Sequence, residues 1–222
     1  SGWGNNELQY YTADNVEVSN GNLVIISRAD NPLPDSAFGY NPSYTFSSGR
    51  IRTQGKFDFK YGRVEARIKM PDTKGIWNAF WLLGSDPSPY GEWAAKGELD
   101  IVETWRRGDP GLGIDPFISG AAHFGGPFPY NTRFDKALEP FDFFSDYHVY
   151  AIEWDELEVR WFVDGINYFS LRRDNYWNYF DDAENGFMPG GPSAPFDQEF
   201  HIILNAAVGG NLPDSANEPP LN

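Results

Sequence analysis

The sequence predicts an all-β fold in which two antiparallel sheets pack against each other. Short apolar stretches recur about every 8–12 residues, as in β-sandwiches, and 23 glycines and 17 prolines separate them. No stretch keeps the 3.6-residue apolar period of a long amphipathic helix. The chain has 222 residues, the size of one all-β domain with a large core, so we expect a single domain over residues 1–222.

The strands are marked by alternating apolar and polar residues with turn residues between them. Asn20-Gly21 favours a tight turn, and Asp164-Gly165 is a strong hairpin signal. The longest alternating stretch, residues 49–70, predicts two antiparallel strands joined at Tyr61-Gly62. A meander is predicted over residues 148–155, 158–163 and 166–171, and further strands over residues 7–12, 22–27, 76–83, 118–124 and 200–205.

Three segments rich in Gly, Pro and Asp predict loops, at residues 30–45, 106–116 and 173–197. The third is too long for an ordinary connection, which indicates a functional role. Its aromatic residues either cover a cleft or pack on the sandwich: Tyr176, Trp177, Tyr179 and Phe180.

Composition excludes several classes of partner. A net charge of −15 argues against nucleic acids and anionic membranes, whereas a neutral polysaccharide is compatible with it. The sequence has no cysteine, which excludes disulfides, thiol chemistry and thiolate metal sites. No apolar run reaches the ~18 residues of a membrane span, and no Gly-x-Ser-x-Gly elbow supports a triad hydrolase. Aromatic residues make up 17% of the chain, so some are expected to bind a ligand such as a sugar ring, although an aromatic-rich core is the alternative.

The segment Gly-Glu-Leu-Asp-Ile-Val-Glu-Thr-Trp holds three carboxylates in what otherwise reads as a buried strand. Strict alternation places Glu98 and Asp100 on one face, but Val102 comes next and the third acid, Glu103, follows one residue late. A β-bulge in which Ile101 and Val102 oppose a single partner residue returns Glu103 to the face of the other acids. We therefore predict a bulged strand with a row of acids on one face.

The spacing of these acids suits glycosidic bond cleavage. Glu98 and Glu103 are about four ladder steps apart, roughly 13 Å between Cα atoms, and their side chains can approach the ~5–5.5 Å carboxyl separation of retaining glycosidases. Asp100 lies between them, and because three clustered acids cannot all ionise cheaply, at least one carboxyl pKa should be raised, as a general acid requires. The alternative is a solvated acidic edge strand, which the apolar neighbours disfavour.

The motif resembles the Glu-x-Asp-x-x-Glu signature of glycoside hydrolase family 16, in the bulged form of its laminarinases. Further blocks that resemble laminarinases cover nearly the whole chain in the family's order: NNELQYYT (5–12), SGRIRTQGKFDFKYGRVEARIKMP (48–71), GIWNAFWLLG (75–84), HVYAIEWD (148–155), WFVDG (161–165) and PFDQEFHIILNAAVGG (195–210). The resemblance implies a concanavalin-like β-jelly-roll sandwich of two curved antiparallel sheets, with a substrate groove on the concave face.

The resemblance also implies an activity, the endo-acting hydrolysis of β-1,3-glucosidic bonds in laminarin-type β-glucans with retention. By motif position Glu98 is the nucleophile, Glu103 the general acid and then base, and Asp100 the residue that holds and tunes Glu98. Two alternatives stay open. One is a mixed-linkage β-1,3-1,4-glucanase or another polysaccharide hydrolase of the family, and the other is a glucan-binding module without turnover.

The expected substrate-binding residues rest mainly on the resemblance. It places Asn5, Arg50, His123 and Gln198 near the sugar, although a turn asparagine, an exposed strand arginine and a core histidine are the ordinary readings of the first three. Two of the tryptophans share a face of the same predicted strand, and each of them can either line the cleft or fill the core. Trp93 lies in a loop and is expected to stack on a glucose ring. The tryptophans expected at the cleft are Trp77, Trp81, Trp93 and Trp105.

No metal or cofactor is predicted, because His148 and His201 lie in apolar strands without ligand spacing. A structural calcium site of the family draws on terminal strands that this chain lacks, so the resemblance does not carry it over, and the domain is expected to be trimmed at both ends. Leu212 stands where the family usually has Trp, which removes one stacking platform. We expect a secreted monomer with its leader removed, acting on β-glucan, with no nucleic-acid or membrane partner.

Overall fold

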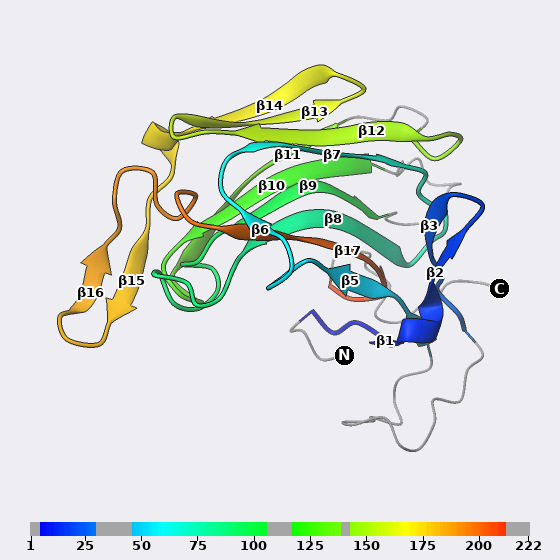
Figure 1. Ribbon diagram of the computed structural model, residues 1–222, viewed down its shortest axis with the longest axis horizontal. Helices are drawn as coiled ribbons and strands as arrows, with labels where there is room; N and C mark the ends of the chain where they lie inside the picture. The colour runs from blue at the N-terminus through cyan, green and yellow to red at the C-terminus, as the bar shows by residue number, and fades with distance from the viewer. Residues whose placement is uncertain (1–4, 30–45, 106–116, 139–142, 212–222) are drawn as a thin grey trace.

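Two main antiparallel sheets pack against each other, and the inner one is the larger (Figure 1). The computed structural model describes residues 5–29, 46–105, 117–138 and 143–211, so the loops predicted at 30–45 and 106–116 lie outside the described residues. The inner sheet has the order β11-β10-β9-β8-β17-β5, and β6 also pairs with β17. Its strands are β5 (Arg50–Arg52), β6 (Asp58–Phe59), β8 (Ile76–Gly84), β9 (Glu98–Trp105), β10 (Phe117–Gly125), β11 (Asn131–Leu138) and β17 (Phe200–Val208).

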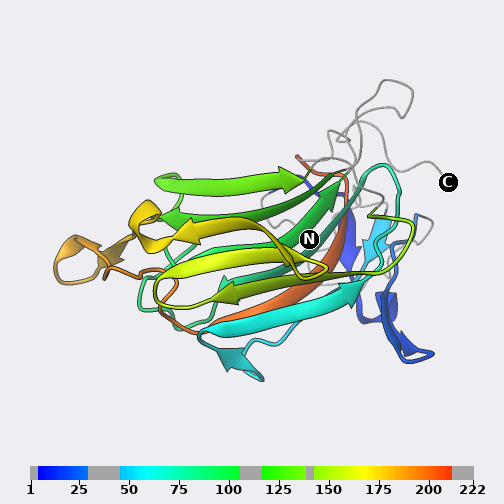
Figure 2. The ribbon, with the colours of Figure 1, turned by 90° about the horizontal axis from the view of Figure 1, so that it is seen from above.

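The outer sheet covers the convex side of the inner sheet (Figures 1 and 2). Its order is β14-β13-β12-β7, and all of its pairs are antiparallel. The strands are β7 (Gly62–Ile68), β12 (His148–Trp154), β13 (Glu158–Val163) and β14 (Ile166–Arg172), so the predicted meander is confirmed. This arrangement leaves the concave face of the inner sheet free of the outer sheet, and the predicted jelly-roll sandwich is confirmed.

The core lies between the two sheets. Leu82 and Leu99 of the inner sheet and Tyr150, Ile152 and Trp161 of the outer sheet are all fully buried. Fully burying an apolar side chain of this size stabilises a fold by about 1.5–3 kcal/mol. Because side chains alternate across a strand, a regular strand such as β8 gives every second residue to the core and leaves the others for the concave face.

Two tight turns follow the predictions. Asn20 and Gly21 have φ of 51° and 77° and join β2 (Val16–Ser19) to β3 (Asn22–Ile25). Asp164 and Gly165 have φ of 49° and 79° and join β13 to β14. Positive φ at both central positions matches the twist of a hairpin, and Asn, Asp and Gly adopt it at least cost.

The prediction of one hairpin over residues 49–70 is wrong. β5 and β6 pair with β17 in the inner sheet, whereas β7 pairs with β12 in the outer sheet. The chain crosses between the layers at Tyr61, whose φ is 63°. Both sheets face the same core, so strands on either side show the same alternation, and the pattern does not reveal which sheet a strand joins.

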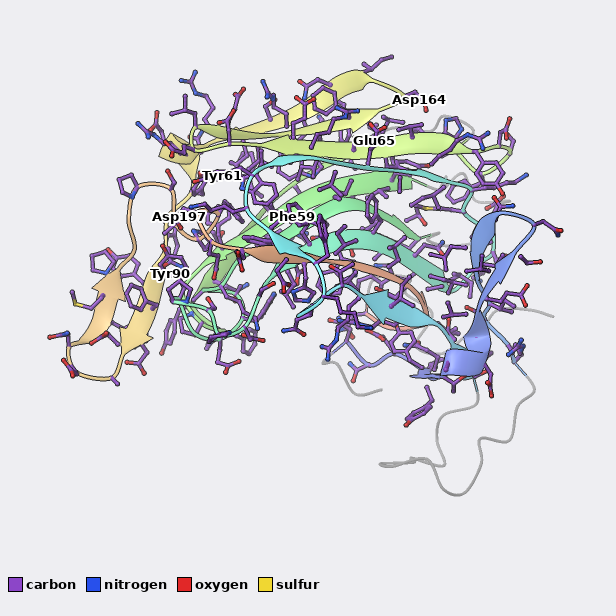
Figure 3. All side chains as sticks on the ribbon, in the orientation of Figure 1. Phe59, Tyr61, Glu65, Tyr90, Asp164 and Asp197 are labelled. Atoms are coloured by element: carbon purple, nitrogen blue, oxygen red, sulfur yellow. The ribbon has the colours of Figure 1, made fainter. Side chains whose placement is uncertain are left out.

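The predicted long loop at 173–197 contains secondary structure of its own. It holds the turn η3 (Arg173–Asn175) and the hairpin of β15 (Tyr179–Asp182) and β16 (Gly186–Pro189), which stands apart from both sheets in Figure 1. Figure 3 shows Tyr90 and Asp197 beside it, and the Tyr90 hydroxyl donates to Asp197 Oδ1 at 2.8 Å. Tyr176 packs on Phe196 with ring centroids 4.9 Å apart, so part of the segment covers the sandwich.

Two short strands and one short helical turn complete the list of described elements. β1 (Gln9–Tyr11) pairs in parallel with β4 (Phe46–Ser48), and η1 (Ala13–Asn15) follows β1. Helical structure in the described ranges is limited to short turns, and none of it is long and apolar enough to cross a membrane.

Candidate active site

Strand β9 contains the predicted bulge. On β8, the adjacent residues Phe80 and Trp81 pair with Val102 and Asp100, which leaves Ile101 without a partner. On β10, the register with β9 shifts between Ser119 and Ala121, so Gly120 alone opposes Ile101 and Val102. The extra residue lies at the position that the phase of the three acids predicted.

The bulge sorts the side chains of β9 onto two faces. Leu99, Ile101 and Val102 are at most 1% exposed and belong to the core between the sheets. Glu98 and Glu103 therefore share the concave face with the residue between them, Asp100. Because β9 lies between β8 and β10 in the middle of the inner sheet, the alternative of a solvated acidic edge strand is excluded.

Trp161 of the outer sheet holds the bulge from behind. Its indole N–H donates to the Asp100 carbonyl oxygen at 2.7 Å, and its side chain is fully buried. Gly120 leaves the space that this contact needs, since a Cβ there would lie 2.6 Å from Trp161 Cδ1 and 2.5 Å from the Tyr168 hydroxyl. The backbone of the acidic row is thus fixed through the core.

Each glutamate of the row accepts a hydrogen bond from a tryptophan. The Trp77 indole N–H donates to Glu103 Oε1 at 2.8 Å, and the Trp93 indole N–H donates to Glu98 Oε2 at 3.0 Å. Trp77 is 9% exposed, which makes it a positioning residue for Glu103 with little free ring surface. Trp93 is half-buried, so it can both hold Glu98 and face a sugar.

His123 lies on β10 directly opposite Glu98. Its Nε2 is 3.4 Å from Asp100 Oδ2 and 3.7 Å from Glu98 Oε1, and its ring centroid is 5.7 Å from that of Trp93. His123 therefore lies beside the acids, as the resemblance implied. Donor atoms of Glu98, Asp100 and His123 lie within 4.8 Å of one another, a spacing that would also admit a cation.

Burial raises the pKa of all three acids. It raises the pKa of Glu98 to about 8, with the charge of Asp100 adding to the effect, and the pKa of Asp100 to about 7. The pKa of Glu103 also rises to about 8, first through burial and then through Asp100, while the Trp77 hydrogen bond opposes the rise. Carboxyls with raised pKa values retain protons near neutral pH, which allows one of them to act as an acid.

Arg50 and Trp81 form another part of the concave face. The Arg50 guanidinium carbon lies 4.9 Å from the Trp81 ring centroid, a cation–π contact. The Trp81 indole N–H donates to Asn205 Oδ1 at 2.8 Å, and Asn205 Nδ2 donates to the Tyr11 hydroxyl at 3.3 Å. Burial lowers the pKa of Arg50, and nearby groups, Glu98 among them, oppose this shift.

Asn5 and Trp105 lie toward the end of β9. Trp105 is 7% exposed and packs edge-on against Trp77, with centroids 6.5 Å apart. The Asn5 carbonyl accepts from the Asn211 N–H at 2.9 Å, and a Cβ on Gly210 would lie 3.0 Å from that oxygen and 3.5 Å from Trp77 Cε3. Asn5 thus lies next to the tryptophan that holds Glu103.

Gln198, which was expected near the sugar, makes its hydrogen bonds within the protein. Its side chain is 7% exposed, and its amide nitrogen donates to the Lys96 carbonyl at 2.7 Å and to the Pro195 carbonyl at 3.3 Å. Its amide oxygen accepts from Ser88 Oγ at 2.8 Å. With both ends of the amide engaged, Gln198 ties together the loops before β9 and β17.

Sequence reasoning missed Tyr11, Asn205 and Arg133. Asn205 accepts the hydrogen bond from Trp81 and donates one to Tyr11. Arg133 lies opposite His123 on β11, and its charge lowers the pKa of Asp100 and Glu103. Asn205 could have been predicted from the sequence, because it is a polar residue within a nearly continuous apolar strand. Arg133 could not, because β11 was not predicted.

Similarity to known proteins agrees with this geometry. A family model described as glycosyl hydrolases family 16 matches residues 4–190. The chain is 40% identical, over 95% of its length, to glucan endo-1,3-beta-glucosidase A1 of Niallia circulans, of which it covers 29%. It is 37% identical to a glucan endo-1,3-beta-glucosidase of Cryptopygus antarcticus, over 96% of this chain and 73% of that protein.

A solved structure extends the likeness to the fold. The catalytic domain of an endo-1,3-beta-glucanase (laminarinase) from Thermotoga petrophila is 39% identical and superposes with a TM-score of 0.74, over 99% of this chain and 79% of the other. The family match covers the strands that carry the three acids. This chain therefore belongs to glycosyl hydrolases family 16.

Proposed function

We propose that this chain hydrolyses internal β-1,3-glucosidic bonds of laminarin-type β-glucans with retention of anomeric configuration. The observation that carries the proposal is the bulge in β9, which presents Glu98, Asp100 and Glu103 on the concave face. Relatives that cover the whole chain, such as the Cryptopygus antarcticus protein, are named as glucan endo-1,3-beta-glucosidases. Family 16 hydrolases generally need no cofactor, and the proposed reaction uses only side chains of this chain.

The reaction proceeds in two displacements. The Glu98 carboxylate attacks the anomeric carbon while Glu103 gives its proton to the glycosidic oxygen, so the bond between the two sugars breaks and a glycosyl ester forms on Glu98. Glu103, now ionised, takes a proton from water, and the resulting hydroxide attacks the same carbon and releases Glu98. Asp100 lies between the two glutamates. Burial raises the pKa of Glu98, the charge of Asp100 raises it further, and that of His123 lowers it.

A concave sheet face that the outer sheet leaves open suits attack within a chain rather than at its end. Because a polysaccharide substrate is too large to enter a cell, we also propose that the enzyme is secreted. A mixed-linkage β-1,3-1,4-glucan would fit the same acids, so the substrate has to be decided by experiment.

The substrate is tested by measuring reducing ends released from laminarin, mixed-linkage β-glucan, cellulose and agar. We expect the highest kcat/KM on laminarin, with a mixture of oligosaccharides early in the reaction and the β-anomer as first product by NMR. A preference for mixed-linkage glucan would assign the second substrate instead. Binding of laminarin without any product would leave only a recognition function.

Substitution of each acid tests the assigned roles. Glu98→Gln should lower kcat on laminarin by about 10⁴-fold or more, because the nucleophile is lost. Glu103→Gln should lower it to a similar extent, but azide should restore turnover of an activated aryl glycoside by trapping the intermediate. Asp100→Asn should cause a smaller loss. Ordinary hydrolysis by Glu98→Gln would contradict the mechanism, and Glu17→Gln, an exposed change on β2, serves as the control.

The pH dependence of kcat/KM should follow the raised pKa values. Glu103 must be protonated, so activity should fall as the pH rises through the pKa of about 8, and it should fall on the acid side as Glu98 becomes protonated. Unperturbed carboxyls would instead place the alkaline limb near pH 5. With a dinitrophenyl glycoside, which needs no proton, the alkaline limb should disappear. An alkaline limb below pH 6 on laminarin would contradict the burial of Glu103.

Removal of the indole donor behind the bulge should impair the reaction through the position of Asp100. Trp161→Phe leaves the buried Asp100 carbonyl without its donor, a loss of about 1–3 kcal/mol in stability. Because this carbonyl belongs to the bulge, we also expect kcat to fall about tenfold with little change in KM, and the alkaline limb to shift. The measurements are thermal melts and the pH profile of kcat.

Trp154→Phe is the matched control for this experiment. Trp154 is also buried, and its indole N–H donates to a backbone carbonyl, that of Phe196, at 2.9 Å. It should lose similar stability while the pH profile stays in place. Equal effects of the two variants on kcat and on the pH profile would show that the Trp161 contact only stabilises the fold.

A further inference from the structure

Exposed aromatic rings form a surface beside the candidate active site. They belong to the turn after β10 and to the β15–β16 hairpin with the residues just before it, two segments far apart in sequence. Aromatic residues are normally buried, so a group of rings with 44–71% exposure indicates a binding role. We call the following residues the aromatic surface: Phe128, Tyr130, Trp177, Tyr179 and Phe187.

The aromatic surface is continuous with the residue that holds Glu98. The Phe128 ring centroid lies 6.3 Å from that of Trp93, and the Phe128 N–H donates to the Trp93 carbonyl at 3.1 Å. Tyr130 follows in the same turn, and its ring meets that of Phe187 edge-on at 6.3 Å. The rings therefore lead from the acidic row onto the hairpin.

The hairpin uses its other face for its own packing. Tyr179 and Asp181 share a face with Phe187, because Asp181 pairs with Phe187 and side chains alternate along each strand. Phe180 points to the opposite face and packs on Tyr90 with centroids 5.5 Å apart. Tyr179 and Phe187 are thus not the rings that hold the hairpin on the body of the protein.

The base of the hairpin is well fixed. Asn178 is 4% exposed and its Nδ2 donates to the Ala95 carbonyl at 2.6 Å and to the Gly125 carbonyl at 3.3 Å. Trp177 packs edge-on against the buried Phe124, with centroids 6.4 Å apart. A surface built on such a base is ordered before a ligand arrives, which lowers the entropy cost of binding.

The chemistry of the aromatic surface fits a neutral sugar chain. Rings such as those of Tyr179 and Phe187 offer area to the apolar faces of pyranoses, and the exposed Asp181 carboxylate between them accepts hydrogen bonds from hydroxyls. The net charge of −15 disfavours polyanions. We propose that the aromatic surface binds a stretch of the same β-glucan that lies beyond the cleft on the Trp93 side, an inference that rests on the proposed function.

The test compares binding of a polymer and of a short oligosaccharide. The double variant Tyr130→Ala/Phe187→Ala is made in the Glu98→Gln background, so that no substrate is consumed, and Kd is measured by calorimetry for laminarin and for laminaritriose. We expect the Kd for laminarin to rise about tenfold, equivalent to about 1.4 kcal/mol, and the Kd for laminaritriose to rise at most about a third as much. Tyr147→Ala is the control, since Tyr147 is 37% exposed beside the outer sheet.

Each outcome decides the proposal. A laminarin Kd equal to that of the Glu98→Gln parent would overturn it, as would an equal loss for polymer and trisaccharide, which would confine the effect to the cleft. A comparable loss in Tyr147→Ala would show that any exposed ring has this effect and would also overturn it. If the Glu98→Gln parent bound no β-glucan, the proposed function itself would fail, a result visible before the double variant is compared.

Discussion

The strict alternation of side chains along a β-strand is the constraint on which the site depends. Glu98 and Glu103 are an odd number of positions apart in the sequence, so a regular strand would turn one of them into the core. The extra residue in β9 removes this conflict, because Ile101 and Val102 both enter the core opposite the single Gly120. The catalytic geometry is therefore a property of backbone register, and it requires partners that tolerate the shift on both sides of β9.

The row of acids works against the stability of the fold. Burial raises the pKa of Glu98 and Glu103 from their ordinary value to about 8, so the folded state binds more protons than the unfolded chain in that interval. The free energy of unfolding then decreases as the pH rises through the interval, by at most about 1.4 kcal/mol per pH unit for each carboxyl. The tryptophan N–H donors and the charges of His123 and Arg133 lower the pKa values of the glutamates, but less than burial raises them. A carboxyl of the row therefore keeps a proton that it can give to the leaving group.

The sequence allowed prediction wherever local chemistry decides the structure. The phase of the acids located the bulge, and Asp164-Gly165 located a hairpin, because only a few residues tolerate its dihedral angles. Predictions failed where a distant partner decides. Residues 49–70 alternate in the same way for either sheet, so the pattern does not tell which sheet each strand joins. The same limit explains why Tyr11 was missed, since its role comes from a contact 194 positions away.

The acids and the aromatic surface lie on different elements of the molecule. The acids are fixed by the register of β9 with its neighbours and by the hydrogen bond from Trp161 of the outer sheet. The turn after β10 and the β15–β16 hairpin contact the sugar, in our proposal, without contributing to that register. Changes in the hairpin therefore leave the bulge intact, and the same acids can serve different glucans when loops at the rim of the groove vary.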